Sequence, residues 1–142
     1  MSVSGSEFVD ITCVVSSGST GLVQFMIVQS SGVDSSYSAG NLTCKICAGT
    51  SCGVTHAMGV LQNDPDTGEA AIVRVLGVSK IIASDAIAVN AAITSTTAGL
   101  AVTATSGTWV IGRAESASTA ANQVISARIW GGGFTYNTLS TA

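Results

Sequence analysis

Charged and aromatic side chains are scarce in this chain, and the scarcity excludes one class of partner. Of the 142 residues, 9% are charged and 5% are aromatic, whereas about a quarter are charged in an ordinary globular protein. The five basic side chains are outnumbered by eight acidic ones, and the first basic residue is Lys45. The sequence therefore has no basic stripe to neutralise phosphates, and we expect no nucleic-acid partner.

Long hydrophobic runs and a leader-like N-terminus are also missing. The first ten residues, MSVSGSEFVD, carry Glu7 and Asp10 and lack the basic and apolar regions of a secretory signal. The most apolar region, residues 70–93, is interrupted by charged residues such as Arg74 and Asp85, so it does not read as a membrane span. We expect neither a secretory signal nor a membrane partner.

A surface with so little charge has to be built from hydroxyl groups and small side chains. Such a surface is typical of extracellular or virion β proteins, and it also suits a protein that is largely covered by its partners. A formal net charge of −3 gives only modest solubility to a free monomer. We therefore expect a virion-type β protein whose hydroxyl-rich surface is also covered in part by partners.

Short apolar or alternating runs between turn residues predict a mainly β domain, a compact sandwich or barrel with at most one or two short helices. The expected strands are residues 8–15, 22–29, 41–48, 58–62, 69–80, 100–105, 109–114 and 123–130. Residues 81–92 favour a short helical turn, with Ser84 as a plausible N-cap, over two short strands. We divide the chain into an N-terminal arm (1–12), a β domain (13–130) and a C-terminal tail (131–142).

One strand–turn–strand unit is written nearly twice. Residues 59–77 read GVLQNDPDTGEAAIVRVLG, and residues 112–131 read GRAESASTAANQVISARIWG. Each begins with glycine, crosses a turn-rich middle and ends in a strand that closes on Arg-(Val/Ile)-x-Gly. The only proline, Pro65, lies in the first turn, where its fixed φ is favourable. Both units predict β-sheet, and neither contains an evident catalytic or ligand-binding motif.

Four cysteines and the single histidine are the residues with metal-ligand chemistry: Cys13, Cys44, Cys47, Cys52 and His56. Zinc is disfavoured because Cys44 and Cys47 lie in one predicted strand, where side chains three apart point to opposite faces. The alternatives are buried reduced thiols and a disulfide such as Cys47–Cys52. We expect no metal and no cofactor, and the sequence leaves the redox state of the cysteines open.

No catalytic constellation is recognisable. His56 has no adjacent nucleophile or orienting partner of the kind that general-base catalysis requires. Asp64, Asp66 and Glu69 have a spacing that can hold calcium, but turn formation explains these carboxylates more simply. We expect a protein that is not an enzyme.

Four short motifs follow one another in the middle of the chain: Val-Arg-Val-x-Gly-Val at 73–78, Ala-Ile-Ala-x-Asn at 86–90, Ala-Gly-x-Ala-Val at 98–102 and Val-Ile-Gly-Arg-Ala at 110–114. Through these motifs the stretch 59–113 resembles the bacteriophage head decoration, or capsid cement, family. It covers roughly residues 41–130 and does not include the cysteines or His56. The resemblance implies a compact β domain of the β-tulip type, a homotrimer without enzymatic activity. Such a protein binds the outer surface of the phage capsid and bridges major capsid protein subunits, which stabilises the shell.

The candidate capsid contacts lie at the two ends of the chain. An N-terminal arm with a strand-like start is able to pair with a sheet edge of the capsid protein, and the aromatic residues near the triple glycine are able to anchor a partner. For the C-terminal residues, packing against the protein's own core is an equally good reading. Removal of residues 1–10 is expected to abolish capsid binding and leave the fold. The candidates are Phe8, Val9, Ile11, Trp130, Phe134 and Tyr136.

The alternative function is a carbohydrate- or receptor-binding β module of a phage tail or fibre. Sugar sites usually need exposed aromatic platforms beside carboxylates or amides. Trp109, Trp130 and Tyr136 are the aromatic residues near plausible loops. This reading predicts a glycan-array signal without capsid binding.

Overall fold

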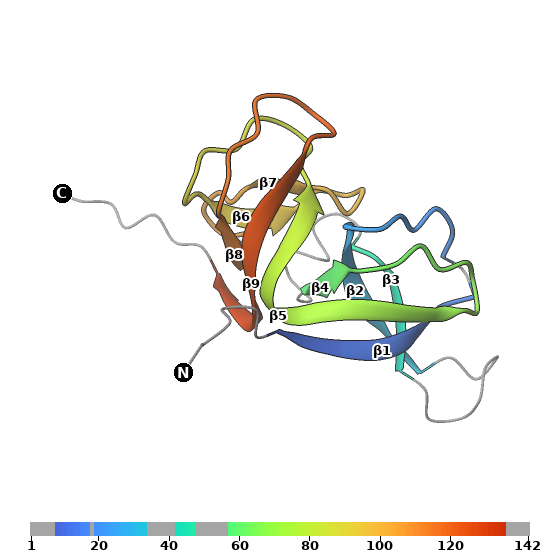
Figure 1. Ribbon diagram of the computed structural model, residues 1–142. Coiled ribbons are helices and arrows are strands. Elements are labelled where there is room, and N and C mark those ends of the chain that lie inside the picture. The colour runs from blue at the N-terminus through green and yellow to red at the C-terminus, as the bar shows by residue number, and fades with distance from the viewer. Residues whose placement is uncertain (1–7, 18, 34–41, 48–56, 136–142) are drawn as a thin grey trace, which may run out of the picture.

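The computed structural model describes residues 8–17, 19–33, 42–47 and 57–135, and these residues form strands and turns with no helix (Figure 1). No helix long and apolar enough to cross a membrane is found among them. The prediction of a compact, mainly β domain is confirmed. The strands are β1 (Val9–Val15), β2 (Ile27–Val33), β3 (Leu42–Ile46), β4 (Ala57–Leu61), β5 (Ala70–Ile82), β6 (Ala92–Ser95), β7 (Ala101–Thr103), β8 (Trp109–Ala114) and β9 (Val124–Thr135).

The first five strands close into a barrel. Their order is β1-β3-β2-β4-β5, and β1 pairs again with β5 to complete the ring. β1 and β3 are parallel, through the pairs Val14–Thr43 and Val15–Cys44. The other neighbouring pairs of this ring are antiparallel. Closure satisfies backbone groups that an open sheet would leave at its edges.

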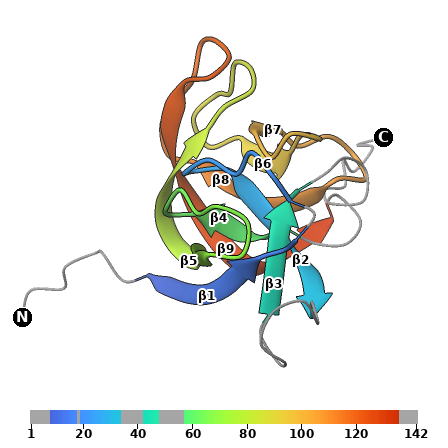
Figure 2. The same cartoon turned by 90° about the vertical axis from the view of Figure 1, so that its right-hand side faces the viewer.

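β5 belongs to two rings because it is long and bent. Its first half pairs with β1, and residues 77–82 pair with β9. Gly77, at the change of partner, has a φ of 114°, a conformation that glycine adopts without strain. Beyond β9 the sheet continues through β8, β6 and β7, and Ala101 of β7 bridges back to Ala83, just after β5. Figures 1 and 2 show β5 turning from the barrel into this second ring.

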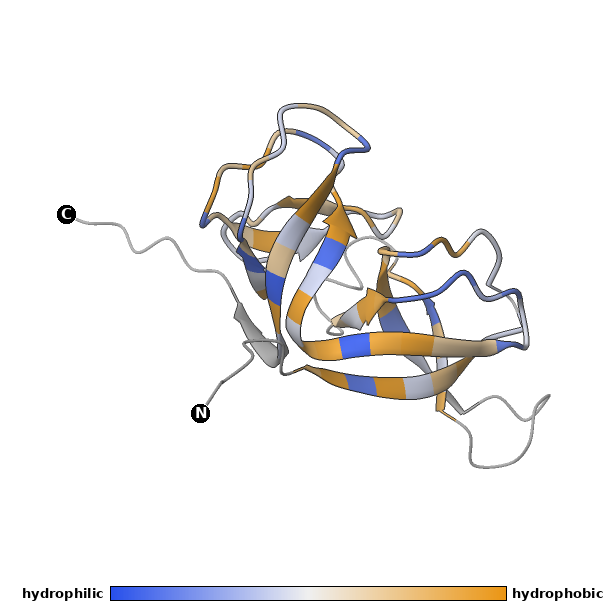
Figure 3. Cartoon of the chain, viewed as in Figure 1, coloured by the Kyte–Doolittle hydropathy of each residue, from blue (hydrophilic) through white to orange (hydrophobic). Residues whose placement is uncertain are grey.

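Alternation along the strands sends apolar side chains into the two rings. In β5, Ala71 and Val73 are buried whereas Ile72 is exposed, and Figure 3 shows apolar and polar positions alternating along β1 and β5. The core of the first barrel consists of Cys13, Val15, Leu22, Val28, Cys44, Leu61, Ala71 and Val73. A larger cluster runs from the barrel into the second ring and includes Ile27, Val60, Ile81, Ile87, Ile93, Ile111, Ile125 and Ile129.

The twin sequence units fold as twin hairpins with the same register. In the first unit the residue after Gly59 pairs with the arginine of the closing strand, as Val60–Arg74. In the second unit the residue after Gly112 does the same, as Arg113–Arg128. A Cβ added at either glycine would overlap the carbonyl oxygen of the arginine in its own unit. The sequence repeat is therefore a repeat of structure, with one hairpin in each ring.

The expected strand at residues 22–29 is wrong in its first half, because β2 begins only at Ile27. Phe25 has a φ of 73°, which a strand does not allow, and the Met26 N–H donates to the carbonyl of Val23 in a turn. Leu22 is nevertheless 8% exposed and belongs to the barrel core. The apolar run thus reflects a turn that fills the barrel and not the first half of a strand.

The expected helical turn within residues 81–92 is also wrong. β5 continues to Ile82, Ala83 bridges to β7, and Ile87 forms an isolated bridge with Ser118. Asn90 has a φ of 68°, which breaks the local path without a helix. The alanine and isoleucine residues of this segment supply apolar side chains to the second ring. Their pairing with distant strands outweighs the local helix propensity of alanine.

β1 and β9 extend into the ranges that the sequence suggests as arm and tail. β1 begins at Val9 and pairs with β5 from there on. β9 runs to Thr135 and pairs with the start of β8 as Trp109–Thr135 and Val110–Phe134, after an irregularity opposite Ile111. The triple glycine therefore lies within a strand.

Candidate interaction site at the bend of β5

Arg74 holds the bend of β5 in place through three contacts. Its Nε and Nη2 donate to the two carboxylate oxygens of Asp10 on β1, at 2.9 and 3.2 Å. Its Nη1 donates to the carbonyl of Val78, 2.9 Å away on the far side of Gly77. Its guanidinium carbon lies 3.9 Å from the ring centroid of Phe8, an arrangement in which cation and ring attract. One side chain thus joins the start of β1 to both halves of β5.

Four large apolar side chains remain exposed around this arginine, and we call them the bend patch: Phe8, Val9, Leu76 and Val78. Each is between 47% and 51% exposed. Val9 and Leu76 are paired across β1 and β5. The ring of Phe8 lies over the guanidinium of Arg74, which also donates a hydrogen bond to the backbone carbonyl of Val78. Exposed apolar side chains gathered at one bend, on a surface with so little charge, are a candidate site of contact with another macromolecule.

The structure separates the six predicted contact residues. Phe8 and Val9 belong to the bend patch, whereas Ile11 is half-buried and packs against the barrel core. Trp130 is half-buried against the small cluster of Ala92, Ala104 and Val110. For Phe134 only the backbone pairing in β9 is described, and Tyr136 lies outside the described residues. Phe8 and Val9 are thus brought to one surface, whereas Ile11 and Trp130 pack against core clusters.

Sequence reasoning missed Leu76, Val78 and the ion pair of Arg74 with Asp10. The signal for the first two is the run Val73–Val78, in which apolar residues fill positions that strict alternation in a half-buried strand would give to polar ones. The ion pair joins residues 64 positions apart in sequence, and no local pattern indicates it.

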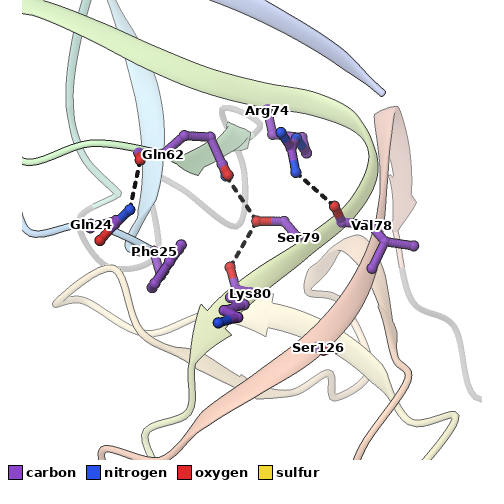
Figure 4. A pocket seen from close by; sticks show the side chains of 8 residues that line it. All are labelled: Gln24, Phe25, Gln62, Arg74, Val78, Ser79, Lys80 and Ser126. Atoms are coloured by element: carbon purple, nitrogen blue, oxygen red, sulfur yellow. Dashed lines mark hydrogen bonds between the residues drawn. The ribbon is translucent and has the colours of Figure 1, made fainter. Parts of the chain in front are cut away.

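A pocket of about 450 Å³ lies beside the bend (Figure 4). Its lining comes from the turn before β2, the residue after β4, the second half of β5 and β9. The lining includes Gln24, Phe25, Gln62, Ser79 and Lys80. Arg74 and Val78 line it as well, so the pocket and the bend patch share one wall.

Two of the cysteines are buried thiols in the barrel core. Cys13 and Cys44 are free, 2% and 0% exposed, and lie on the neighbouring strands β1 and β3. The hydrogen bond to Cys13 and burial both raise the pKa of the Cys44 thiol well above its usual range. Cys47 is disulfide-bonded, and the predicted pairing with Cys52 lies outside the described residues, as does His56.

Among residues 8–17, 19–33, 42–47 and 57–135 no group of three or more metal-ligating side chains occurs. The carboxylates of the β4–β5 turn act on the backbone instead. Asp64 accepts a hydrogen bond from the N–H of Gln24 at 2.6 Å, and Glu69 accepts one from the N–H of Asp66 at 3.0 Å. Glu69 thus bonds the backbone of its own turn, as the sequence suggested, whereas Asp64 joins this turn to the segment before β2.

Both tryptophans pack against core clusters. Trp109 packs against the large core cluster, and Trp130 packs against the small one. Each is partly buried.

Fold and surface together define an all-β domain of two rings that share one bent strand, with an apolar contact patch at the bend. Neither a protein-family model nor a curated protein matches the sequence. A solved structure does share the fold: the head fiber gp8.5 N base of bacteriophage phi29 superposes with a TM-score of 0.63. The match covers 92% of this chain and 100% of that chain at 19% sequence identity. At this identity the likeness establishes a common fold.

Proposed function

We propose that this protein is a structural virion protein that binds the outside of a phage head and stabilises the shell through contacts with the major capsid protein. The observation that carries the proposal is the fold, which over nearly the whole chain is that of the base of a phage head fibre. The motif resemblance to head decoration proteins independently favours the same location. The bend patch supplies a surface for the capsid contact.

The size of the bend patch favours a multivalent attachment. Burying a large apolar side chain completely contributes about 1.5–3 kcal/mol, so four half-exposed side chains contribute roughly 4 kcal/mol together. That free energy corresponds to a dissociation constant of about 1 mM, before the cost of association is counted. Three linked copies convert such weak contacts into tight binding. We therefore propose that the protein acts as a homotrimer.

Co-sedimentation with empty heads of the virus that encodes this chain tests the proposal. The wild-type protein should pellet with the heads, and Leu76→Glu, which places a charge in the bend patch, should stay in the supernatant. Val124→Glu is the matched control, because Val124 is also an exposed strand residue, at 52%, but lies at the other end of the β5–β9 pairing. A wild-type protein that fails to pellet contradicts head binding. Equal binding by wild type and Leu76→Glu would leave head binding standing and exclude the bend patch.

A further inference from the structure

The pocket beside the bend presents hydrogen-bond acceptors in fixed positions. The side-chain nitrogen of Gln62 donates to the Val60 carbonyl at 3.0 Å and to the Ser79 hydroxyl at 2.8 Å. The side-chain nitrogen of Gln24 donates to the Gln62 carbonyl at 2.8 Å. Both amide nitrogens are thus used within the protein, and within the described part of the chain no group donates to either side-chain oxygen. These two oxygens are available to hydroxyl groups of a ligand.

The pocket also carries one uncompensated positive charge. Arg74 is matched by Asp10, at 2.9 Å. Lys80 is exposed, and the ion pairs of the described residues do not include it. A ligand in this pocket therefore gains from an anionic group placed near Lys80.

Phe25 gives the pocket an apolar wall at a cost in backbone strain. Its φ of 73° is rare for a large side chain. The conformation is held by its N–H, which donates to the Leu61 carbonyl at 2.7 Å, and by its carbonyl, which accepts from Ile82 at 3.3 Å. Strained residues of this kind concentrate at binding sites, where the surrounding structure over-determines them.

We propose that this pocket binds an acidic saccharide, a sugar that carries a carboxylate. The carboxylate lies near Lys80, the hydroxyls donate to the oxygens of Gln24 and Gln62, and the carbon-bound face of the ring packs on Phe25. The volume of about 450 Å³ lies within the range of small-ligand sites, which is roughly 300–1,000 Å³. The pocket thus combines a cation, two acceptor oxygens and an apolar wall. An acidic side chain of a protein would use only the cation. The inference does not depend on head attachment.

Amide-resolved NMR titration of the full chain with D-glucuronate tests the proposal, with D-glucose and N-acetylglutamate as comparison ligands. Glucuronate should shift the amide resonances of Gln62, Ser79 and Lys80, with a dissociation constant on the order of 1 mM. Glucose, in which a hydroxymethyl group replaces the carboxylate, should bind about threefold to fivefold more weakly, as expected for loss of one exposed charge contact. N-acetylglutamate, which lacks the ring and its hydroxyls, should also bind more weakly than glucuronate.

Two lysine variants complete the test. Lys80→Gln should reduce glucuronate binding to the level of glucose. Lys45→Gln should leave it unchanged, because Lys45 is likewise exposed and outside the ion pairs but lies on β3, away from the pocket. Absence of shifts at the pocket residues, or unchanged binding in Lys80→Gln, would overturn the proposal. Equal binding of N-acetylglutamate would overturn it too, since the pocket would then recognise a carboxylate alone.

Discussion

Replacing the paired glycines, Gly59 and Gly112, by alanine should destabilise the protein strongly and to a similar degree. Each glycine lies against the backbone of the opposite strand in its hairpin. A Cβ at Gly59 would stand 2.9 Å from the carbonyl carbon of Arg74, and one at Gly112 would stand 3.0 Å from that of Arg128, with the carbonyl oxygen nearer still in both. Because the obstacle is backbone and not the end of a flexible side chain, the hairpin has to open to make room.

The cost follows from the price of overpacking, which is about 1–3 kcal/mol for an added methyl group in a packed site. Since backbone yields less than side chains, we expect about 2–3 kcal/mol for each alanine variant. For a domain of this size, about 1 kcal/mol lowers the melting temperature by roughly 4 °C. The expected decrease is therefore about 8–12 °C, a large share of a total stability of about 5–15 kcal/mol.

Urea unfolding and calorimetry of Gly59→Ala and Gly112→Ala measure this cost, with Gly107→Ala as the control. Gly107 has a φ of 88° and no atom within 4 Å of an added Cβ, so it reports the strain of positive φ alone, about 1 kcal/mol. If the two paired variants lose no more stability than the control, the close approach of strands in the twin hairpins is refuted.

Further consequences concern the bend, the core thiols and the assembly. Arg74→Lys should lower the free energy of unfolding by about 1–2 kcal/mol, because lysine cannot form the forked contact with Asp10. Arg128→Lys, at the matching position but 63% exposed, should change it by less than about 0.5 kcal/mol. Similar losses in the two variants would contradict the role given to Arg74 at the bend. The Cys44 thiol should resist iodoacetamide in the native protein at mildly alkaline pH and react after unfolding, and mass-spectrometric detection of native labelling would refute its burial. Deletion of residues 1–10 should lower the melting temperature because it removes the first part of β1 and Asp10, the partner of Arg74. An unchanged melting temperature would show that the start of β1 contributes nothing. Light scattering should give three times the chain mass, and a monomer at all concentrations would exclude the homotrimer.

Strand positions could be predicted from sequence where local pattern and tertiary pairing agree. The strand Trp109–Ala114 is predicted with its observed bounds, and the twin units are recognised as hairpins because glycine, turn and closing strand are all local signals. The prediction of a strand over the whole of residues 22–29 is wrong because turn residues that fill a barrel are as apolar as those of a buried strand. Only the positive φ of Phe25 distinguishes the two, and φ cannot be read from side-chain chemistry.

The candidate site was accessible to sequence reasoning in part. Phe8 and Val9 can be predicted as contact residues because they begin the first apolar run after a polar N-terminus. Leu76 becomes a surface residue only because β5 bends at Gly77, and the pocket exists only because two rings meet there. Both features depend on pairings between distant strands, which periodicity within one segment cannot specify.

The proposed role on a phage head is tested most directly by locating the protein on virions. Cryo-electron microscopy of purified virions, supported by gold-labelled antibody against this chain, should place it on the outer surface of the head, and heads that lack it should show no corresponding density. Density or label confined to the tail, or absence of the protein from purified virions, would contradict a head-bound structural role.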